Sequence, residues 1–167
     1  MTKINFQSIS NNLELVGDIW AAKSKSKISY PDEANEMCFQ IEENSYWFRH
    51  RNNCIVEVVK QFPPKGIFFD IGGGNGFVAK ELEENGIETV LVEPGEIGVA
   101  NARKRGLRQI ICAALENAGF KSHTLSTVGL FDVVEHIEDD KAFLKLVFEL
   151  LEPGGRLYIT VPAFNFL

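Results

Sequence analysis

The chain has 167 residues, of which 45% are hydrophobic and 24% are charged, and its formal net charge is −6. This length and composition are those of one soluble globular domain with a core of its own. The acidic balance makes a dedicated nucleic-acid binder unlikely, because phosphate contacts require a clustered basic surface.

The cysteines and the apolar runs of the sequence bear on the cellular compartment of the protein. The three cysteines, Cys38, Cys54 and Cys112, are an odd number without metal-type spacing. Neither a signal peptide nor an apolar run of membrane length is visible. We therefore expect a reduced, cytoplasmic protein that has no contact with membranes.

The first 45 residues are weakly patterned. Four apolar residues recur there at near-helical spacing and predict a short amphipathic helix: Ile9, Leu13, Val16 and Trp20. Residues 23–35 are polar and contain a proline, which indicates a loop, a linker or part of a lid. The predicted organisation is an N-terminal helical or flexible segment or lid over residues 1–45, followed by the main domain over residues 46–167.

An aromatic and basic run, Trp47 to Arg51, leads into a segment over residues 54–60 that looks helical. Pro63 and Pro64 break this helix before the first predicted strand. Arg51, or Arg49, either pairs with a carboxylate of a bound ligand or lies on the surface beside an aromatic packing cluster. Both interpretations remain open at this point.

The most informative stretch follows, where an apolar strand over residues 67–71 runs into a glycine turn and then into a helix over residues 77–84. Strand, glycine turn and helix form the first unit of a nucleotide-binding α/β fold. Its glycines reach backbone angles closed to other residues and let a ligand lie directly on the main chain. The helix N-terminus behind them offers unpaired N–H groups.

The spacing separates this turn from a dinucleotide fingerprint. That fingerprint reads G-x-G-x-x-G, and Phe77 stands at its third glycine. The chain instead reads D-x-G-x-G-x-G from Asp70, which resembles the first motif of class I S-adenosylmethionine (SAM) methyltransferases. The resemblance implies that SAM is the cofactor and S-adenosylhomocysteine (SAH) the product. It also implies that Asp70 holds the glycine loop or bonds the methionyl amine. The turn residues that it assigns to the cofactor are Gly72, Gly73, Gly74, Asn75 and Gly76.

The second strand, over residues 89–92, ends at Glu93. This acid lies about twenty residues beyond the turn, where a nucleotide-binding fold places the carboxylate that binds the ribose hydroxyls. The alternative is a helix-capping acid before Pro94. Because Glu93 has both the expected separation from the glycine turn and a position at the end of a strand, we favour the ribose role. Pro94 is assigned to the cofactor site beside it. The next helix is predicted to run to about Arg105.

The third strand covers residues 108–112 and leads into Ala113, Ala114 and Leu115. In the resembled family this loop borders the adenine, often with an acid that bonds the exocyclic amine. Alanine stands at that acid position here, so the resemblance leaves Leu115 as an apolar wall for the base.

The fourth strand, over residues 127–131, is followed by D-V-V-E-H-I, which resembles the post-strand motif of many small-molecule methyltransferases, including the quinone-biosynthesis O-methyltransferases. Phe131 and Asp132 are therefore assigned to the cofactor crevice. Asp132, Glu135 and His136 share one side if the turn is helical. His136 is the candidate general base for a substrate hydroxyl. The three residues are also suitable metal ligands, or have a structural role next to the cofactor, which we favour.

Asp139 or Asp140 caps a last helix, whose predicted apolar stripe is Phe143, Leu144, Val147, Phe148 and Leu151. A fifth strand over residues 156–162 follows a Pro-Gly-Gly turn. The sequence ends soon afterwards, although the resembled family continues with two more strands. We expect either a fragment or a homodimer mate or partner that covers the open sheet edge.

The alternation of strands and helices predicts an α/β fold: a Rossmann-like three-layer sandwich with a parallel sheet of about five strands, helices on both faces and an N-terminal helical segment. The sequence indicates a SAM-dependent methyltransferase that acts on a small-molecule oxygen or nitrogen acceptor. A non-catalytic or regulatory SAM-binding domain is the alternative. An NAD-dependent oxidoreductase is less favoured, since no Tyr-x-x-x-Lys is present.

Overall fold

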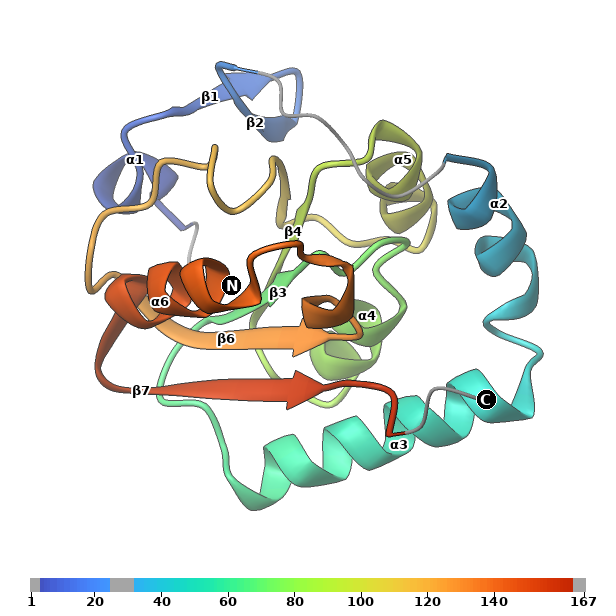
Figure 1. Cartoon of the computed structure of the whole chain (residues 1–167). Coiled ribbons are helices and arrows are strands. Elements are labelled where there is room, and N and C mark those ends of the chain that lie inside the picture. The colour runs from blue at the N-terminus through green and yellow to red at the C-terminus, as the bar shows by residue number, and fades with distance from the viewer. Residues whose placement is uncertain (1–3, 25–31, 164–167) are drawn as a thin grey trace.

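The computed structural model describes residues 4–24 and 32–163 (Figure 1). Its helices are α1 (Phe6–Ile9), α2 (Asp32–Ile41), α3 (Tyr46–Gln61), α4 (Phe77–Glu84), α5 (Glu96–Lys104) and α6 (Asp140–Leu150), with a 3₁₀ turn η1 (Val134–His136). Its strands are β1 (Leu13–Val16), β2 (Ile19–Ala22), β3 (Phe68–Ile71), β4 (Thr89–Glu93), β5 (Ile110–Cys112), β6 (Leu125–Phe131) and β7 (Leu151–Thr160).

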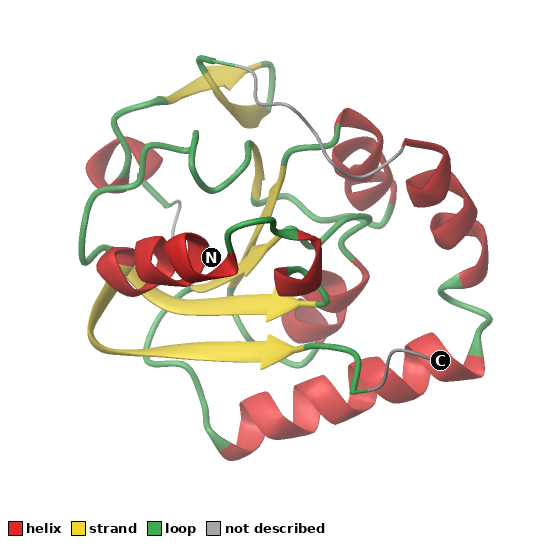
Figure 2. Ribbon diagram, viewed as in Figure 1, coloured by secondary structure: helices red, strands yellow, loops and turns green. Residues whose placement is uncertain are grey.

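The strands form one sheet in the order β1-β2-β5-β4-β3-β6-β7, and every neighbouring pair is parallel except β1 with β2. Helices lie on both faces, as Figure 2 shows in red against the yellow strands. The predicted Rossmann-like α/β fold is confirmed. The chain order reverses direction at β3, between β4 and β6, and such a switch point opens a crevice beyond the carboxyl ends of the strands.

The core explains this layering. Strands β3 and β4 are buried along their whole length, as expected for central parallel strands. Phe69 and Val92 face a cluster that includes Phe143 of α6, whereas Phe68 faces α3 and α4 on the opposite side of the sheet. Successive side chains therefore anchor helices on opposite faces, which fixes the orientation of the strand ends.

The predicted helix over Ile9 to Trp20 is wrong. Leu13–Val16 and Ile19–Ala22 instead form an antiparallel hairpin with Val16 opposite Ile19, so Gly17 and Asp18 make the turn. Gly17 has a φ of +65°, the left-handed region that such a two-residue turn requires. The apolar spacing was misread because a strand–turn–strand unit places apolar residues at similar intervals.

This hairpin extends the sheet beyond the five predicted strands, because β2 pairs in parallel with β5. Residues 13–22 thus share a sheet with the domain predicted over residues 46–167, and the division at residue 45 stays a prediction. Of the polar segment predicted as a loop or linker, residues 32–35 begin α2, and residues 25–31 lie outside the described residues.

Helix α6 begins at Asp140, and the Asp139 side chain accepts a hydrogen bond from the Ala142 N–H at 3.0 Å, as the predicted cap requires. Phe143 and Val147 are buried, but Phe148, which was assigned to the same stripe, is 75% exposed. The stripe is therefore narrower than predicted, and α6 ends at Leu150. None of the described helices is long and apolar enough to cross a membrane.

Strand β7 is the last strand on its side of the sheet, next to β6 and above α3 (Figure 1). Leu157 and Ile159 of this strand are 37% and 43% exposed. A partner or further chain over this edge stays a prediction.

Candidate functional site

A cavity of about 460 Å³ opens beyond the carboxyl ends of β3, β4 and β6. The loops predicted to converge there do so. The predicted site residues that line the cavity are Arg51, Asp70, Gly72, Gly73, Gly74, Asn75, Glu93, Pro94, Leu115, Phe131, Asp132 and His136. Gly76 is not among the lining residues.

Gly76 has a packing role. It adopts a φ of +70°, and a Cβ on it would lie 2.4 Å from Leu107 Cδ1 and 3.0 Å from Ala102 Cβ. The absence of a side chain therefore lets the start of α4 approach α5 and the residues that follow it. This is the helix-packing function of a third glycine in a nucleotide-binding turn.

Gly73 and Gly74 form the part of the turn that faces the cavity. A Cβ on Gly73 would lie 2.4 Å from Asp70 Oδ2 and 2.5 Å from Leu91 Cδ1, so no larger residue fits without displacing the buried carboxylate. Gly74 has a φ of +53°, a backbone angle at which residues other than glycine are strained. The turn thus presents bare backbone to the cavity.

Asp70 lies beneath this turn with no exposed surface, and neither of its carboxylate oxygens makes a hydrogen bond of standard geometry within the described part of the chain. Burial raises the pKa of Asp70 to about 7, and the negative charge of Glu93 adds to this rise, whereas the positive charge of Arg51 and the Ala79 backbone N–H oppose it. A buried acceptor without a partner is costly. Asp70 therefore retains unused hydrogen-bond acceptor capacity next to the cavity.

Glu93 fastens the turn to the start of α5. Its Oε2 accepts a hydrogen bond from the Gly74 N–H at 2.9 Å, and its Oε1 accepts one from the Gly95 N–H at 2.7 Å. Burial raises the pKa of this carboxyl, and the two backbone donors oppose the rise. Gly95 is the N-cap of α5, so Glu93 does bind the start of this helix, as the capping interpretation of Glu93 predicted. Each oxygen retains a second lone pair for a ligand.

The loop after β5 forms an apolar side of the cavity. Leu115 is buried, with 4% of its surface exposed, and lies beside Ala113 and Ala114 among the lining residues. Pro94 lines the cavity from the loop after β4. These residues give this part of the cavity an apolar lining.

Arg51 reaches the cavity from α3. Its Nη2 lies 2.7 Å from Asp132 Oδ2, and its guanidinium lies 5.9 Å from the centre of the Trp47 ring. Asp132 Oδ1 accepts a hydrogen bond from Thr160 Oγ1 at 2.9 Å. Arg51 thus lies beside an aromatic ring and pairs with a carboxylate of the chain itself, and its pairing with a ligand carboxylate stays a prediction.

The predicted common face of Asp132, Glu135 and His136 is wrong. Asp132 has a φ of +58°, which interrupts any helical turn before η1 begins at Val134. Asp132 and His136 line the cavity, whereas Glu135 is exposed and is not among the lining residues. Within residues 4–24 and 32–163, no group of three histidine, cysteine or acidic residues is arranged to hold a metal ion.

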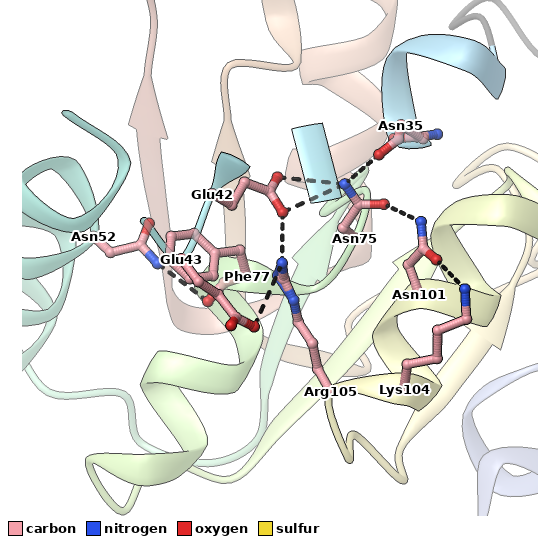
Figure 3. A network of polar contacts seen from close by, with 9 residues as sticks. All are labelled: Asn35, Glu42, Glu43, Asn52, Asn75, Phe77, Asn101, Lys104 and Arg105. Atoms are coloured by element: carbon pink, nitrogen blue, oxygen red, sulfur yellow. Dashed lines mark hydrogen bonds and ion pairs between the residues drawn. The ribbon is translucent and has the colours of Figure 1, made fainter. Parts of the chain in front are cut away.

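Sequence reasoning missed the wall that α2 and the start of α3 contribute. The additional lining residues from this region are Asn35, Cys38, Glu42, Trp47 and Phe48. Figure 3 shows that Asn35 and Glu42 belong to a polar network with Asn75 of the glycine turn. No local motif marks the long-range contacts of α2; the possible lid over residues 1–45 and the aromatic run from Trp47 to Arg51 were the features that pointed toward this wall.

The family described as a methyltransferase domain matches residues 69–159. The ubiquinone biosynthesis O-methyltransferase of Parvibaculum lavamentivorans is 28% identical over 97 residues, which cover 55% of this chain and 38% of that protein. The mitochondrial enzyme of that name from Homo sapiens is 24% identical over 123 residues, or 66% of this chain and 33% of that protein. The chain thus spans between a third and two fifths of the length of these relatives.

Solved structures of methyltransferases also resemble this chain. A SAM-dependent methyltransferase of Thermotoga maritima, described as a possible histamine N-methyltransferase, has a TM-score of 0.59 and 25% identity, with coverage of 76% of this chain and 56% of that one. A putative SAM-dependent methyltransferase of Methanococcus maripaludis has a TM-score of 0.69 and 19% identity, with coverage of 84% and 68%. The family match covers more than half of the sequence and confirms the resemblance to class I SAM-dependent methyltransferases: the chain belongs to the methyltransferase-domain family.

Proposed function

We propose that the cavity binds SAM and that the chain carries the site from which a methyl group is transferred to a small-molecule oxygen or nitrogen acceptor. The observation that carries this proposal is Asp70, a buried carboxyl without a hydrogen bond of standard geometry in the described chain that lines the cavity under a bare glycine turn. A cationic amino group is the partner that such a carboxyl favours most, and the methionyl part of SAM ends in one.

The other lining residues fit the remaining parts of the cofactor. Gly74 leaves room for the methionyl chain against the backbone, because only Asn35 Oδ1, at 3.5 Å, lies within 4 Å of its Cβ position. Glu93 retains lone pairs for the ribose hydroxyls although it already accepts two backbone hydrogen bonds. Leu115 and Pro94 supply apolar surface for the adenine. The product SAH would occupy the same contacts.

When bound, SAM supplies a methyl group that is already activated by its sulfonium. The acceptor atom forms a bond to the methyl carbon while the carbon–sulfur bond breaks and its electron pair stays on sulfur. The residues of the chain therefore have to align the two reactants, exclude water and receive the acceptor's proton. His136 lines the cavity and is the proposed general base for a hydroxyl acceptor.

The acceptor is proposed only as a class. The curated relatives named ubiquinone biosynthesis O-methyltransferase support an oxygen acceptor, and the acidic chain supports a small molecule over a nucleic acid. A cytoplasmic location and a possible homodimer or partner at the sheet edge likewise remain proposals. The family match disfavours an NAD-dependent oxidoreductase.

The test is transfer of a labelled methyl group from SAM to a panel of catechols, phenols and amines. We expect transfer to at least one hydroxyl acceptor, and a loss of about 100-fold in kcat for His136→Gln without a change in SAH affinity. Glu135→Gln is the matched control, because Glu135 adjoins His136 but is not among the cavity residues. Tight SAH binding without transfer to any acceptor would instead indicate a non-catalytic or regulatory SAM-binding domain.

A further inference from the structure

Helix α2 forms one wall of the cavity, and its main packing partner is α5 rather than a strand of the sheet. Asn35 and Cys38 of α2, with Glu42 directly after it, are lining residues. Figure 1 shows α2 beside α5, away from the sheet. The contacts between α2 and α5 therefore decide whether this wall stays in place.

One of these contacts is a buried ion pair. Arg105, the residue that follows α5, places its Nη2 2.8 Å from Glu42 Oε2, and the two side chains are only 3% and 10% exposed. The Arg105 guanidinium lies 4.7 Å from the centre of the Phe39 ring and 4.8 Å from that of Phe77. One charge is thus enclosed between an aromatic ring of α2 and one of α4.

Asn75 connects this pair to the glycine turn (Figure 3). Its Nδ2 donates to the Asn35 carbonyl oxygen at 2.8 Å and lies 3.4 Å from each carboxylate oxygen of Glu42. Its Oδ1 accepts a hydrogen bond from Asn101 Nδ2 of α5 at 3.0 Å. The amide of Asn75 is therefore engaged with both α2 and α5, so one side chain links the glycine turn to the wall and to α5.

We propose that Glu42, Arg105 and Asn75 are positioning residues that fasten α2 over the cofactor cavity and so slow the release of the cofactor. This inference rests on the proposed function. Removing the Glu42 carboxylate would leave the Arg105 guanidinium buried without its partner, which destabilises the docked position of α2. In this proposal SAH leaves through the wall once α2 undocks, and such opening steps limit turnover in many enzymes.

The experiment measures SAH release from the preformed complex by stopped-flow tryptophan fluorescence, since Trp47 lines the cavity. We expect Glu42→Gln to release SAH about tenfold faster while its association rate stays within about twofold of the unaltered chain. Glu43→Gln is the matched control: Glu43 is the next residue, its side chain is 67% exposed, and it lies 4.0 Å from the same Arg105 nitrogen. We expect no change in that variant.

Because Glu42→Gln leaves Arg105 buried without its partner, Phe39→Ala provides a milder second variant. Phe39 contacts Arg105 but is not among the cavity residues. We expect release about threefold faster, with the ion pair retained. Met37→Ala on the same helix is the control, because Met37 is 69% exposed.

A merely structural defect would lower the fraction of chains that bind SAH without changing how fast bound SAH leaves. Unchanged release from both Glu42→Gln and Phe39→Ala, with SAH bound by the unaltered chain, would overturn this inference alone. Failure of the unaltered chain to bind SAH would overturn the proposed function and this inference with it.

Discussion

The two sides of the cavity are built in different ways. The floor consists of the glycine turn, Asp70 and Glu93, at the ends of strands that are buried on both faces. The opposite wall consists of α2 and the start of α3, where two ion pairs lie: Glu42 with Arg105, and Arg51 with Asp132. Backbone and sheet fix the floor, whereas contacts between residues far apart in sequence fix the wall.

This difference separates two tasks. A residue of the floor meets the ligand on a surface that cannot move without disturbing the core, so its substitution should remove binding. A residue of the wall acts on a helix that can shift, so its substitution should change rates and affinity by smaller factors. Substitutions in the floor and in the wall test this difference. They are given below from the largest expected effect to the smallest.

The largest effect is expected at Gly73, in the floor. Gly73→Ala would place a Cβ 2.4 Å from Asp70 Oδ2 and 2.5 Å from Leu91, two buried groups. We expect SAH affinity to fall by more than about 1,000-fold, or roughly 4 kcal/mol, measured by titration calorimetry. Gly86→Ala is the control, because Gly86 has a φ of +81° but nothing within 4 Å of its Cβ position. Equal affinity in both variants would show that the turn does not shape the site.

Asp70 predicts a pH dependence. Its pKa in the folded chain is raised to about 7 from an ordinary value of 3.8. Between these values the folded chain retains a proton that the unfolded chain has released, so Asp70 makes the free energy of unfolding decrease as pH rises through this window, by up to about 1.4 kcal/mol per pH unit.

Asp70→Asn should remove this slope. We expect the variant to gain about 3 kcal/mol of stability relative to the unaltered chain between pH 4 and pH 7, measured by urea unfolding. The same variant should bind SAH more weakly at pH 7.5, because an amide lacks the charge that attracts the ligand's amino group. Parallel stability curves for the two proteins would contradict the burial of an ionisable, unpaired carboxyl.

At Glu93 the expected effect is intermediate. Gln offers one acceptor oxygen, so Glu93→Gln can retain only one of the hydrogen bonds from Gly74 and Gly95. We expect SAH affinity to fall about 30-fold, or roughly 2 kcal/mol, in the same titration. Glu96→Gln, at the first residue of α5, is the control for a lost charge near that helix N-terminus. An unchanged affinity would leave Glu93 with the capping role alone.

The smallest effect is expected in the wall, at Arg51. Its side chain is 17% exposed, and Asp132 keeps a hydrogen bond from Thr160 when Arg51 is lost. We therefore expect Arg51→Met to weaken SAH binding by about threefold, or roughly 0.7 kcal/mol. Arg49→Met, at an exposed position of the same helix, should have no effect. A loss as large as that of Gly73→Ala would abolish the distinction between floor and wall.

The floor was predictable because short patterns encode it. Asp70, the glycine turn and Glu93 occupy positions that the order of strands and helices brings to one edge of the sheet. Of the wall, Arg51 and Asp132 were predicted, but the part that α2 forms was not, because Glu42 and Arg105 show no local pattern and meet only through the packing of α2 on α5. The hairpin over residues 13–22 was missed for a related reason: its pairing with β5 is a long-range contact.

The measurement that tests the central claim most directly is calorimetric titration of the chain with SAH, with NAD titrated in parallel. The account predicts SAH binding in the micromolar range and no response to NAD, because the Asp70 carboxyl and the glycine turn of this cavity fit the methionyl end of SAH. Binding of NAD without SAH, or no binding of SAH at all, would contradict it.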